Sequence, residues 1–569
     1  MLKLLFIALL AICVGADEEG PVLSTHVGKF QGRTIEFGET KVDAFYGLPF
    51  AKPPIKERRF EKPTDTEPSD KLRQATVPKP ACSQPKMAFT DQIPVDEDCL
   101  YLNVFKPKTP SPKGEGYPVL VFVHGGAYQV GSAHMHSMDA VAENFAARGI
   151  VFIAPQYRLG LFGFASTGPK EFAGNYGLWD LRRALLWIRK NAKALDLNLK
   201  KITVGGYSAG SAAVGALTVS EHSRDLFTQA IQMSGSIFGD WATSNKAITL
   251  TEKLATALKC DSQSSTEVKK CLRKFSFEEL YKAFEKSAYD PNDFNLAEFT
   301  PRLDAEFFTS DFPELIQSAP PKPTLATITE NEGILFTLFG KNGIFDRHAL
   351  DKAEFEKFGE EEFKKFVSDK VATESIFGSK AKEVQNKINK FYLGKSRGSD
   401  PKFYKLQYAK ILADMLFVTP QLREMRYKAE AGWPVFMVKN THRKPLNWGN
   451  EHPGMFEETT HGQEYGILFG LPDSYTTDYT KEDDQHREIL LTTIVDFVKT
   501  RSPKTDKAPH FEALSRKHPL IYTEISTTTK LKSPLFGDEL NFWNELTKDY
   551  DFDLIRGIHK KTLRSRTEL

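Results

Sequence analysis

The sequence has no excess of charge of either sign. Its 569 residues include 76 lysines and arginines against 74 aspartates and glutamates, a formal net charge of +2. A protein that binds nucleic acid or an anionic membrane through electrostatics needs a strong positive field. We therefore expect neither nucleic acid nor a membrane surface as a partner, and we expect a small uncharged or mixed-charge molecule as the substrate.

Long apolar runs are missing beyond the N-terminus. Residues 4–14 are apolar, follow Lys3 and precede the small residues Gly15 and Ala16. This run is about half of the ~20 residues that a membrane-spanning helix needs. The pattern is typical of a secretory signal peptide, residues 1–16, rather than of a membrane anchor. We expect no membrane span in the mature chain.

Internal repeats, low-complexity tracts and linkers rich in proline, glycine or serine are also absent, so the sequence indicates no boundary between two domains. The composition, with 40% hydrophobic and 26% charged residues, is that of an ordinary globular protein with a sizeable core. We predict a single catalytic domain over residues 17–569.

Cysteine is scarce, with five in the chain. Cys13 would leave with the signal peptide, and an even number in a secreted chain suggests two disulfides. Four cysteines allow three pairings, of which joining sequence neighbours is the most economical. They are not arranged as C-x-x-C and have no nearby histidine pair, so they predict no zinc site. No motif calls for a metal or a cofactor. The four are Cys82, Cys99, Cys260 and Cys271.

The C-terminus reads R-T-E-L over residues 566–569. It shares its last two residues with the K-D-E-L type of retrieval tail, which acts on proteins that enter the secretory pathway. The tail predicts retention in the lumen of the endoplasmic reticulum, and the alternative is secretion. The chain contains no N-x-[ST] acceptor, so N-glycosylation is not expected.

Apolar runs rich in β-branched residues alternate with helical periodicity. Between two of these runs, Leu178, Leu181, Leu185 and Ile188 recur at helical spacing and predict a helix over residues 178–192. The alternation predicts a central, mostly parallel sheet flanked by helices, an α/β fold. Strands are predicted at residues 119–123, 150–153, 202–204, 228–233, 324–329 and 433–438.

Residues 351–395 differ in composition from the preceding sequence, because they are rich in lysine and glutamate with phenylalanines between them. One interpretation is a cap or lid inserted over the substrate pocket. The other, which we favour, is a peripheral helical layer whose aromatic stripe is ordinary core. The stripe consists of Phe355, Phe358, Phe363 and Phe366.

Residues 206–210 read G-Y-S-A-G and match the pattern G-x-S-x-G, with Ser208 at the centre. In this pattern the serine lies on a sharp turn between a strand and a helix. A serine hydroxyl is a weak nucleophile, so a base must take its proton, and His461 is the candidate. Glu332 is the candidate carboxylate that would hold the imidazole in the correct tautomer. The order serine, acid, histidine is typical of α/β-hydrolases.

A fourth component directly follows the strand predicted at residues 119–123. Residues 124–127 read H-G-G-A and are similar to the H-G-G-G loop whose backbone N–H groups bind an oxyanion. We predict that the donors are the N–H groups of Gly126, Ala127 and Ala209, the last being the residue after the nucleophile.

With these motifs in view, the chain resembles the type-B carboxylesterase and cholinesterase-like family of α/β-hydrolases. Residues 97–104, E-D-C-L-Y-L-N-V, match a specific signature of that family. Residues 45–51, F-Y-G-L-P-F-A, match its N-terminal block, and the similarity continues through residues 174–178, 233–236 and 461–464. The resemblance covers most of the mature chain.

The resemblance carries several expectations. It implies an α/β-hydrolase fold with helical insertions near the pocket and a small-molecule ester as substrate. It implies that Glu332 is the acid and that Arg59 and Glu97 form a buried ion pair. It also implies the disulfides Cys82–Cys99 and Cys260–Cys271.

The departures from the family pattern bear on the substrate. Cholinesterases have a tryptophan in the first disulfide loop that binds a quaternary ammonium group, and this loop has none. Leu335 stands at a position that is often aromatic in cholinesterases. Trp241 matches the tryptophan that lines the family's acyl pocket. Two further departures bear on catalysis: Tyr207 replaces a glutamate found in many relatives, and Ala127 replaces the third glycine of the oxyanion loop.

The leading hypothesis is hydrolysis of small to medium uncharged carboxylic esters through an acyl-enzyme at Ser208. An alternative from another class is a non-catalytic cholinesterase-like binding or adhesion protein. A narrower alternative is a specialised lipase, hormone esterase or cholinesterase.

Overall fold

The computed structural model describes residues 20–85, 93–168, 170–260, 264–290, 293–338, 341, 346–394, 402–443, 458–470, 480–504 and 510–559. The predicted signal peptide and the R-T-E-L tail lie outside these residues. Within the described residues, no helix combines the length and apolar character that crossing a membrane requires.

An 11-stranded sheet runs through the described part of the molecule, in the order β16-β15-β14-β13-β12-β11-β9-β10-β8-β4-β3. From β15 to β10 all neighbours are parallel, and the pairs at the two ends are antiparallel. The strands are β3 (Arg33–Phe37), β4 (Thr40–Pro49), β8 (Tyr101–Pro107), β9 (Tyr117–Val123), β10 (Val151–Pro155), β11 (Leu197–Tyr207), β12 (Gln229–Met233), β13 (Thr324–Thr329), β14 (Val435–Asn440), β15 (Tyr522–Ile525) and β16 (Thr529–Lys532).

All six predicted strands are present, which confirms the mostly parallel sheet. The prediction at residues 433–438 begins two residues early, because Trp433 and Pro434 precede β14. The antiparallel end strands were not predicted. A small second sheet near the N-terminus contains β1 (Val22–Thr25), β2 (Gly28–Gln31) and β5 (Ser69–Gln74).

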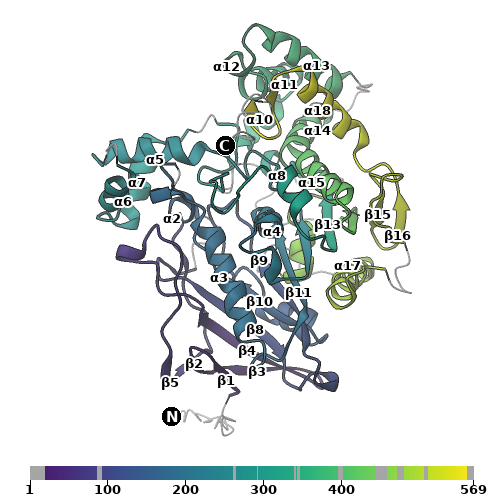
Figure 1. Cartoon of the computed structure of the whole chain (residues 1–569). Coiled ribbons are helices and arrows are strands. Elements are labelled where there is room, and N and C mark those ends of the chain that lie inside the picture. Colours follow the sequence, from purple (N-terminus) through teal and green to yellow (C-terminus); the bar gives the residue numbers. More distant parts are fainter. Residues whose placement is uncertain are drawn as a thin grey trace, which may run out of the picture.

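Helices cover both faces of the large sheet (Figure 1). Side chains of β9 alternate between the two faces: Val119, Val121 and Val123 join the apolar cluster that contains α3 (Tyr176–Lys190) and α4 (Ala209–Val219). Leu120 and Phe122 join the cluster that contains α17 (Lys481–Thr500). A strand buried on both faces reads as a continuous apolar run, which is why the sequence revealed it.

The region between β13 and β14 is largely helical and lies at one end of the molecule (Figure 1). Phe355, Phe358 and Phe363 are buried in the same apolar cluster as α3 and α4, and Phe366 packs against it. The aromatic stripe is therefore part of the core. The helices of this region are α9 (Ile334–Thr337), α10 (Lys352–Lys357), α11 (Glu360–Phe366), α12 (Glu374–Phe377), α13 (Ala381–Leu393), α14 (Phe403–Ala413) and α15 (Thr419–Glu430).

The remaining helices surround the sheet and its loops. They are α1 (Met138–Val141), α2 (Gly160–Phe164), α5 (Lys246–Ala257), α6 (Ser265–Leu272), α7 (Phe277–Ser287), α8 (Phe312–Ser318), α16 (Gln463–Phe469) and α18 (Gly537–Asp549).

Candidate active site

Ser208 lies on the turn between β11 and α4. Its φ of 56° and ψ of −122° are sparsely populated for a residue with a side chain. Two glycines allow the turn: a Cβ at Gly206 would lie 2.3 Å from the carbonyl oxygen of Gly210, and a Cβ at Gly210 would lie 2.1 Å from that of Val123. The glycines of the G-x-S-x-G pattern are therefore required by close backbone contacts.

The structure brings Ser208, His461 and Glu332 together. His461 Nε2 lies 3.0 Å from Ser208 Oγ, and His461 Nδ1 lies 2.6 Å from Glu332 Oε2. The three residues follow β11, β13 and β14, whose carboxyl ends meet at one edge of the sheet. Because the carboxylate accepts, Nδ1 carries the ring proton of the neutral imidazole. Nε2 is then able to accept the hydroxyl proton of Ser208.

Glu332 is fully buried and its two oxygens have three donors. Oε2 accepts from His461, and Oε1 accepts from the hydroxyl of Ser234 and the N–H of Thr329, both at 2.7 Å. Burial alone would raise the pKa of Glu332, but the His461 interaction and the two other hydrogen bonds outweigh it and lower the pKa below its usual value. Glu332 is therefore an ionised carboxylate near neutral pH.

The loop after β9 passes beside Ser208, since a Cβ added at Gly125 would lie 3.0 Å from Ser208 Cβ. Gly126 and Ala127 have φ of 112° and 52°. Among the described residues, neither of their N–H groups has a hydrogen-bond acceptor. Ala209 is the first residue of α4, so its N–H has no acceptor within the helix. The alanine at 127 costs about 1 kcal/mol in this left-handed conformation.

Comparisons with known proteins decide the family. The model of the carboxylesterase family matches residues 19–543. The chain belongs to this family. It is 32% identical over 552 residues to gut esterase 1 of Caenorhabditis elegans, covering 96% of each chain. It is 28% identical over 554 residues to pyrethroid hydrolase Ces2a of Mus musculus, covering 93% of this chain and 92% of the relative. It is 29% identical over 574 residues to liver carboxylesterase 1 of Oryctolagus cuniculus, covering 95% of this chain and 96% of the relative.

Membership in the carboxylesterase family confirms the family resemblance and the α/β-hydrolase fold. It also gives the class of reaction, hydrolysis of carboxylic ester bonds. The large mixed sheet with helices on both faces agrees with this assignment.

In this member of the family, hydrogen bonds tie the loop of His461 to the loop of Glu332. The Thr459 hydroxyl accepts from the N–H of Glu330 at 2.9 Å, and the Thr460 hydroxyl accepts from the N–H of Leu335 at 2.9 Å. Neither threonine was predicted, because the partner of each lies more than a hundred residues away in the sequence. These bonds fix the distance between the acid and the imidazole.

Aromatic rings surround the imidazole. The rings of Phe336 and Phe417 lie 5.2 and 4.5 Å from the His461 ring, and that of Tyr207 lies 4.7 Å from it. Trp241 is buried, donates through Nε1 to the carbonyl oxygen of Leu416 at 2.6 Å and lies 5.5 Å from the Phe417 ring. Phe417 was not predicted, since a lone phenylalanine in a helical segment has no distinguishing pattern.

A second glutamate is buried close to the first. Glu464, in the first turn of α16, accepts a hydrogen bond from the hydroxyl of Thr327. Its other oxygen has no partner among the described residues. Burial, followed by the charge of Glu332, raises the pKa of Glu464 to about 8. This side chain is therefore mostly neutral at pH 7.

The described residues contain the disulfides Cys82–Cys99 and Cys260–Cys271, the pairing of sequence neighbours. Arg59 and Glu97 form the expected ion pair, with Arg59 Nε 2.6 Å from Glu97 Oε2. Their side chains are 9% and 16% exposed, so the pair is mostly buried rather than fully enclosed.

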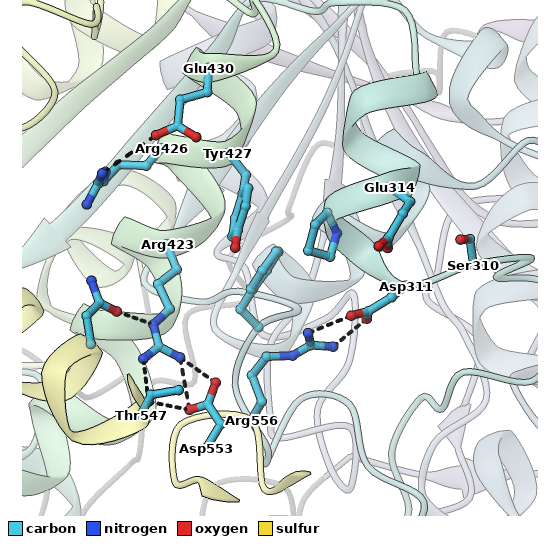
Figure 2. Close-up of a pocket in the computed structure, with 13 residues that line it drawn as sticks. Ser310, Asp311, Glu314, Arg423, Arg426, Tyr427, Glu430, Thr547, Asp553 and Arg556 are labelled. Carbon is cyan, nitrogen blue, oxygen red and sulfur yellow. Dashed lines mark hydrogen bonds and ion pairs between the residues drawn. The ribbon is translucent and has the colours of Figure 1, made fainter. Parts of the chain in front are cut away.

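A cavity of about 590 Å³ lies among α8, α15, α18 and the C-terminal segment (Figure 2). All three of its arginines are paired with acids: Arg423 with Asp553, Arg556 with Asp311 and Arg426 with Glu430. Its lining includes Ser310 but no histidine, so a serine–histidine pair of the kind found at Ser208 is not part of it. The cavity is thus separate from the candidate active site. Its lining residues are Phe238, Ser310, Asp311, Pro313, Glu314, Arg423, Arg426, Tyr427, Glu430, Asn544, Thr547, Asp553 and Arg556.

Proposed function

We propose that this chain hydrolyses small to medium uncharged carboxylic esters, with Ser208 as nucleophile, His461 as general base and Glu332 as the acid that orients the imidazole. The observation that carries the proposal is the chain of contacts from Ser208 Oγ to His461 Nε2 at 3.0 Å and from His461 Nδ1 to Glu332 Oε2 at 2.6 Å. The lowered pKa of Glu332 supports it, because an ionised carboxylate stabilises the imidazolium that forms.

The reaction proceeds in two halves. Ser208 Oγ attacks the acyl carbon as His461 Nε2 takes its proton, and the tetrahedral intermediate collapses as His461 returns that proton to the leaving alcohol. Water then attacks the acyl-enzyme, again giving a proton to His461. The acyl–serine bond breaks, the proton returns to Ser208, and the carboxylic acid leaves.

The N–H groups of Gly126, Ala127 and Ala209 would bind the oxyanion. Within the described part of the chain, the N–H groups of Gly126 and Ala127 have no acceptor, and their loop passes beside Ser208, which supports this role. Losing one such donor typically lowers kcat by about 10²–10³-fold.

The substrate class follows from the surroundings of His461. Trp241 is proposed to line the acyl side, and its contact with Phe417 next to the imidazole supports short to medium acyl groups. A choline ester is a poor candidate, because the loop between Cys82 and Cys99 holds no tryptophan for a quaternary ammonium group and residue 335 is leucine.

We further propose that the protein enters the secretory pathway through residues 1–16 and is retained in the lumen of the endoplasmic reticulum by residues 566–569. The two disulfides support an oxidising compartment. Deleting residues 566–569 should increase secretion, and unchanged secretion would contradict retention.

The decisive experiment compares initial rates of hydrolysis of p-nitrophenyl acetate, butyrate and palmitate by the mature protein and by Ser208→Ala, with a choline ester beside them. Fast short-chain turnover that disappears in the folded variant is expected. Turnover no greater than that of the variant would favour the non-catalytic binding protein instead.

A further inference from the structure

Tyr207 and Tyr465 form a column of stacked rings beside His461. The Tyr207 ring lies 4.7 Å from the imidazole at 36°, and the Tyr465 ring lies 4.9 Å from Tyr207 at 22°. The tyrosines are 9% and 2% exposed. The Tyr465 hydroxyl shares a hydrogen bond of 2.8 Å with Nδ1 of His136, which is buried against Phe122.

The hydrogen bonds of His461 do not by themselves fix its ring. One hydrogen bond joins Nδ1 to Glu332 and the other joins Nε2 to Ser208, and both nitrogen atoms lie in the ring plane. Neither bond restricts tilting of the ring about the line between its two nitrogen atoms. A ring packed against the imidazole supplies the missing restraint, since tilting would require it to move.

We propose that Tyr207 is a positioning residue for His461, held in place by Tyr465 and, through it, by His136. The inference rests on the proposed function, in which His461 is the base. Tyr207 occupies the variable position of G-x-S-x-G, so a single turn after β11 provides both the nucleophile and the ring beside its base. Tyr465 belongs to α16 and His136 lies just before α1, so both segments support the imidazole through the column.

Tyr207 differs in its support from the other two rings near His461. Phe336 and Phe417 stack on each other at 5.3 Å and 16°, and Phe417 continues to Trp241 on the proposed acyl side. Tyr207 continues to Tyr465. Changes at Tyr207 should therefore alter the orientation of the base while leaving the ring set that includes Trp241 in place.

The test compares Tyr207→Leu, which removes the ring, with Tyr207→Phe, which keeps it. We expect Tyr207→Leu to lower kcat about tenfold, near the upper end of aromatic-pair energies, with KM changed less than about twofold. Tyr207→Phe should restore kcat to within about threefold of the parent. Equal kcat in Tyr207→Leu and the parent, or no rescue by phenylalanine, would overturn the proposal.

Variants of Tyr465 provide a second test of the proposal. Tyr465→Leu should lower kcat by about threefold, and the double variant with Tyr207→Leu should be no slower than Tyr207→Leu alone, because Tyr465 acts through Tyr207. Additive losses would contradict the column. If Tyr207→Leu does not fold, the single variant Tyr465→Leu decides instead, and a kcat equal to that of the parent would overturn the proposal. Phe391→Leu is the matched control: it breaks a stacked pair with Phe542, whose rings are 4.1 Å apart in the helical region, and should leave kcat unchanged.

Two further measurements separate this inference from the proposed function. If a fluorophosphonate ester labels neither the parent nor Ser208→Ala, or Ser208→Ala keeps steady-state turnover, the proposed function fails and the inference with it. If turnover depends on Ser208 but Tyr207→Leu has the kcat of the parent, the inference alone fails. Thermal melting of each variant identifies losses due to unfolding.

Discussion

The loop after β13 and the first turn of α16 each bury a glutamate completely, and the two carboxyl groups have opposite properties. Glu332 has three hydrogen-bond donors, including His461, and its pKa is lowered. Glu464 has one identified donor, the hydroxyl of Thr327, and burial with the neighbouring charge of Glu332 raises its pKa to about 8.

The difference shows that burial alone does not set the ionisation of a carboxyl group. Both carboxyl groups lose hydration on burial, which favours their neutral forms, and only Glu332 has enough hydrogen-bond donors to offset this loss. The negative charge of Glu332 raises the pKa of Glu464 further. Pairs of groups whose pKa values are pushed apart in this way are typical of active sites.

The largest effect should come from Glu332→Gln. The amide cannot stabilise an imidazolium and favours the wrong tautomer of His461, so kcat should fall by about 10³–10⁴-fold with the fold intact. Steady-state rates at pH 7 measure this. Glu464→Gln is the matched control, since it replaces a neutral acid by a neutral amide, and its kcat should stay within about threefold of the parent. Similar losses in both variants would contradict the assigned roles.

The second prediction concerns stability and pH. The folded pKa of Glu464 is about 8, above the ordinary 4.5. Below pH 4.5 both states hold the proton. As pH rises to 8, the unfolded chain releases it and the folded chain keeps it, so the folded state loses roughly 3–5 kcal/mol of relative stability. Glu464→Gln should remove this loss.

Urea unfolding of the parent and of Glu464→Gln at pH 5, 7 and 9 checks this. The variant should gain stability over the parent as pH rises. A difference between the two proteins that is constant from pH 5 to 9 would show that Glu464 ionises normally.

A smaller change is expected from Ser234→Ala, which removes one of the donors to Glu332. The pKa of Glu332 should rise, because burial is then opposed by one hydrogen bond fewer, so more of the acid is protonated at low pH and the imidazolium is less stabilised. We expect kcat/KM to fall by about threefold at pH 5 and by less at pH 8. A pH-independent loss would mean that Ser234 acts only on packing.

The smallest change should come from Thr327→Val, the counterpart at Glu464. Removing this hydroxyl leaves the buried acid with less hydrogen bonding and should lower the free energy of unfolding at pH 7 by about 1 kcal/mol. The kcat should remain within about twofold, because the ionisation of Glu332 is unchanged. Urea unfolding and initial rates test both parts. A loss of kcat as large as that of Ser234→Ala would contradict the separation of the two carboxyl groups.

Much of the fold was accessible from the sequence. The central strands are apolar on both faces, as the run around Val121 shows, and such runs can be recognised without a structure. The glycines at 206 and 210 could also be recognised, because a close backbone contact at these positions admits no side chain. The antiparallel end strands were missed. Of these, β3 and β16 are partly exposed and have no long apolar run, while β4 and β8 are mostly buried but are interrupted by polar residues such as Asp43 and Asn103.

Some residues of the candidate site could be predicted from the sequence and others could not. Ser208 became a candidate because its turn imposes a local pattern, and Glu332 and His461 became candidates because of their order in the chain. The hydrogen bond from Ser234 to Glu332 and the ring contact of Phe417 with His461 were not predictable. The partners in these two contacts lie 98 and 44 positions apart in the sequence, and only folding brings them together. Tyr207 was noticed as an unusual residue, but its stacking on Tyr465 was not predictable, since the two lie more than two hundred positions apart.

The sequence by itself therefore determined the kind of sheet, the strained turn at Ser208 and the identity of the residues that follow its strands. These depend on local backbone geometry and on burial, both of which constrain neighbouring residues directly. Only the tertiary structure decided that Glu332 is ionised and Glu464 neutral, because the pKa of a buried carboxyl group depends on which donors and charges surround it in space.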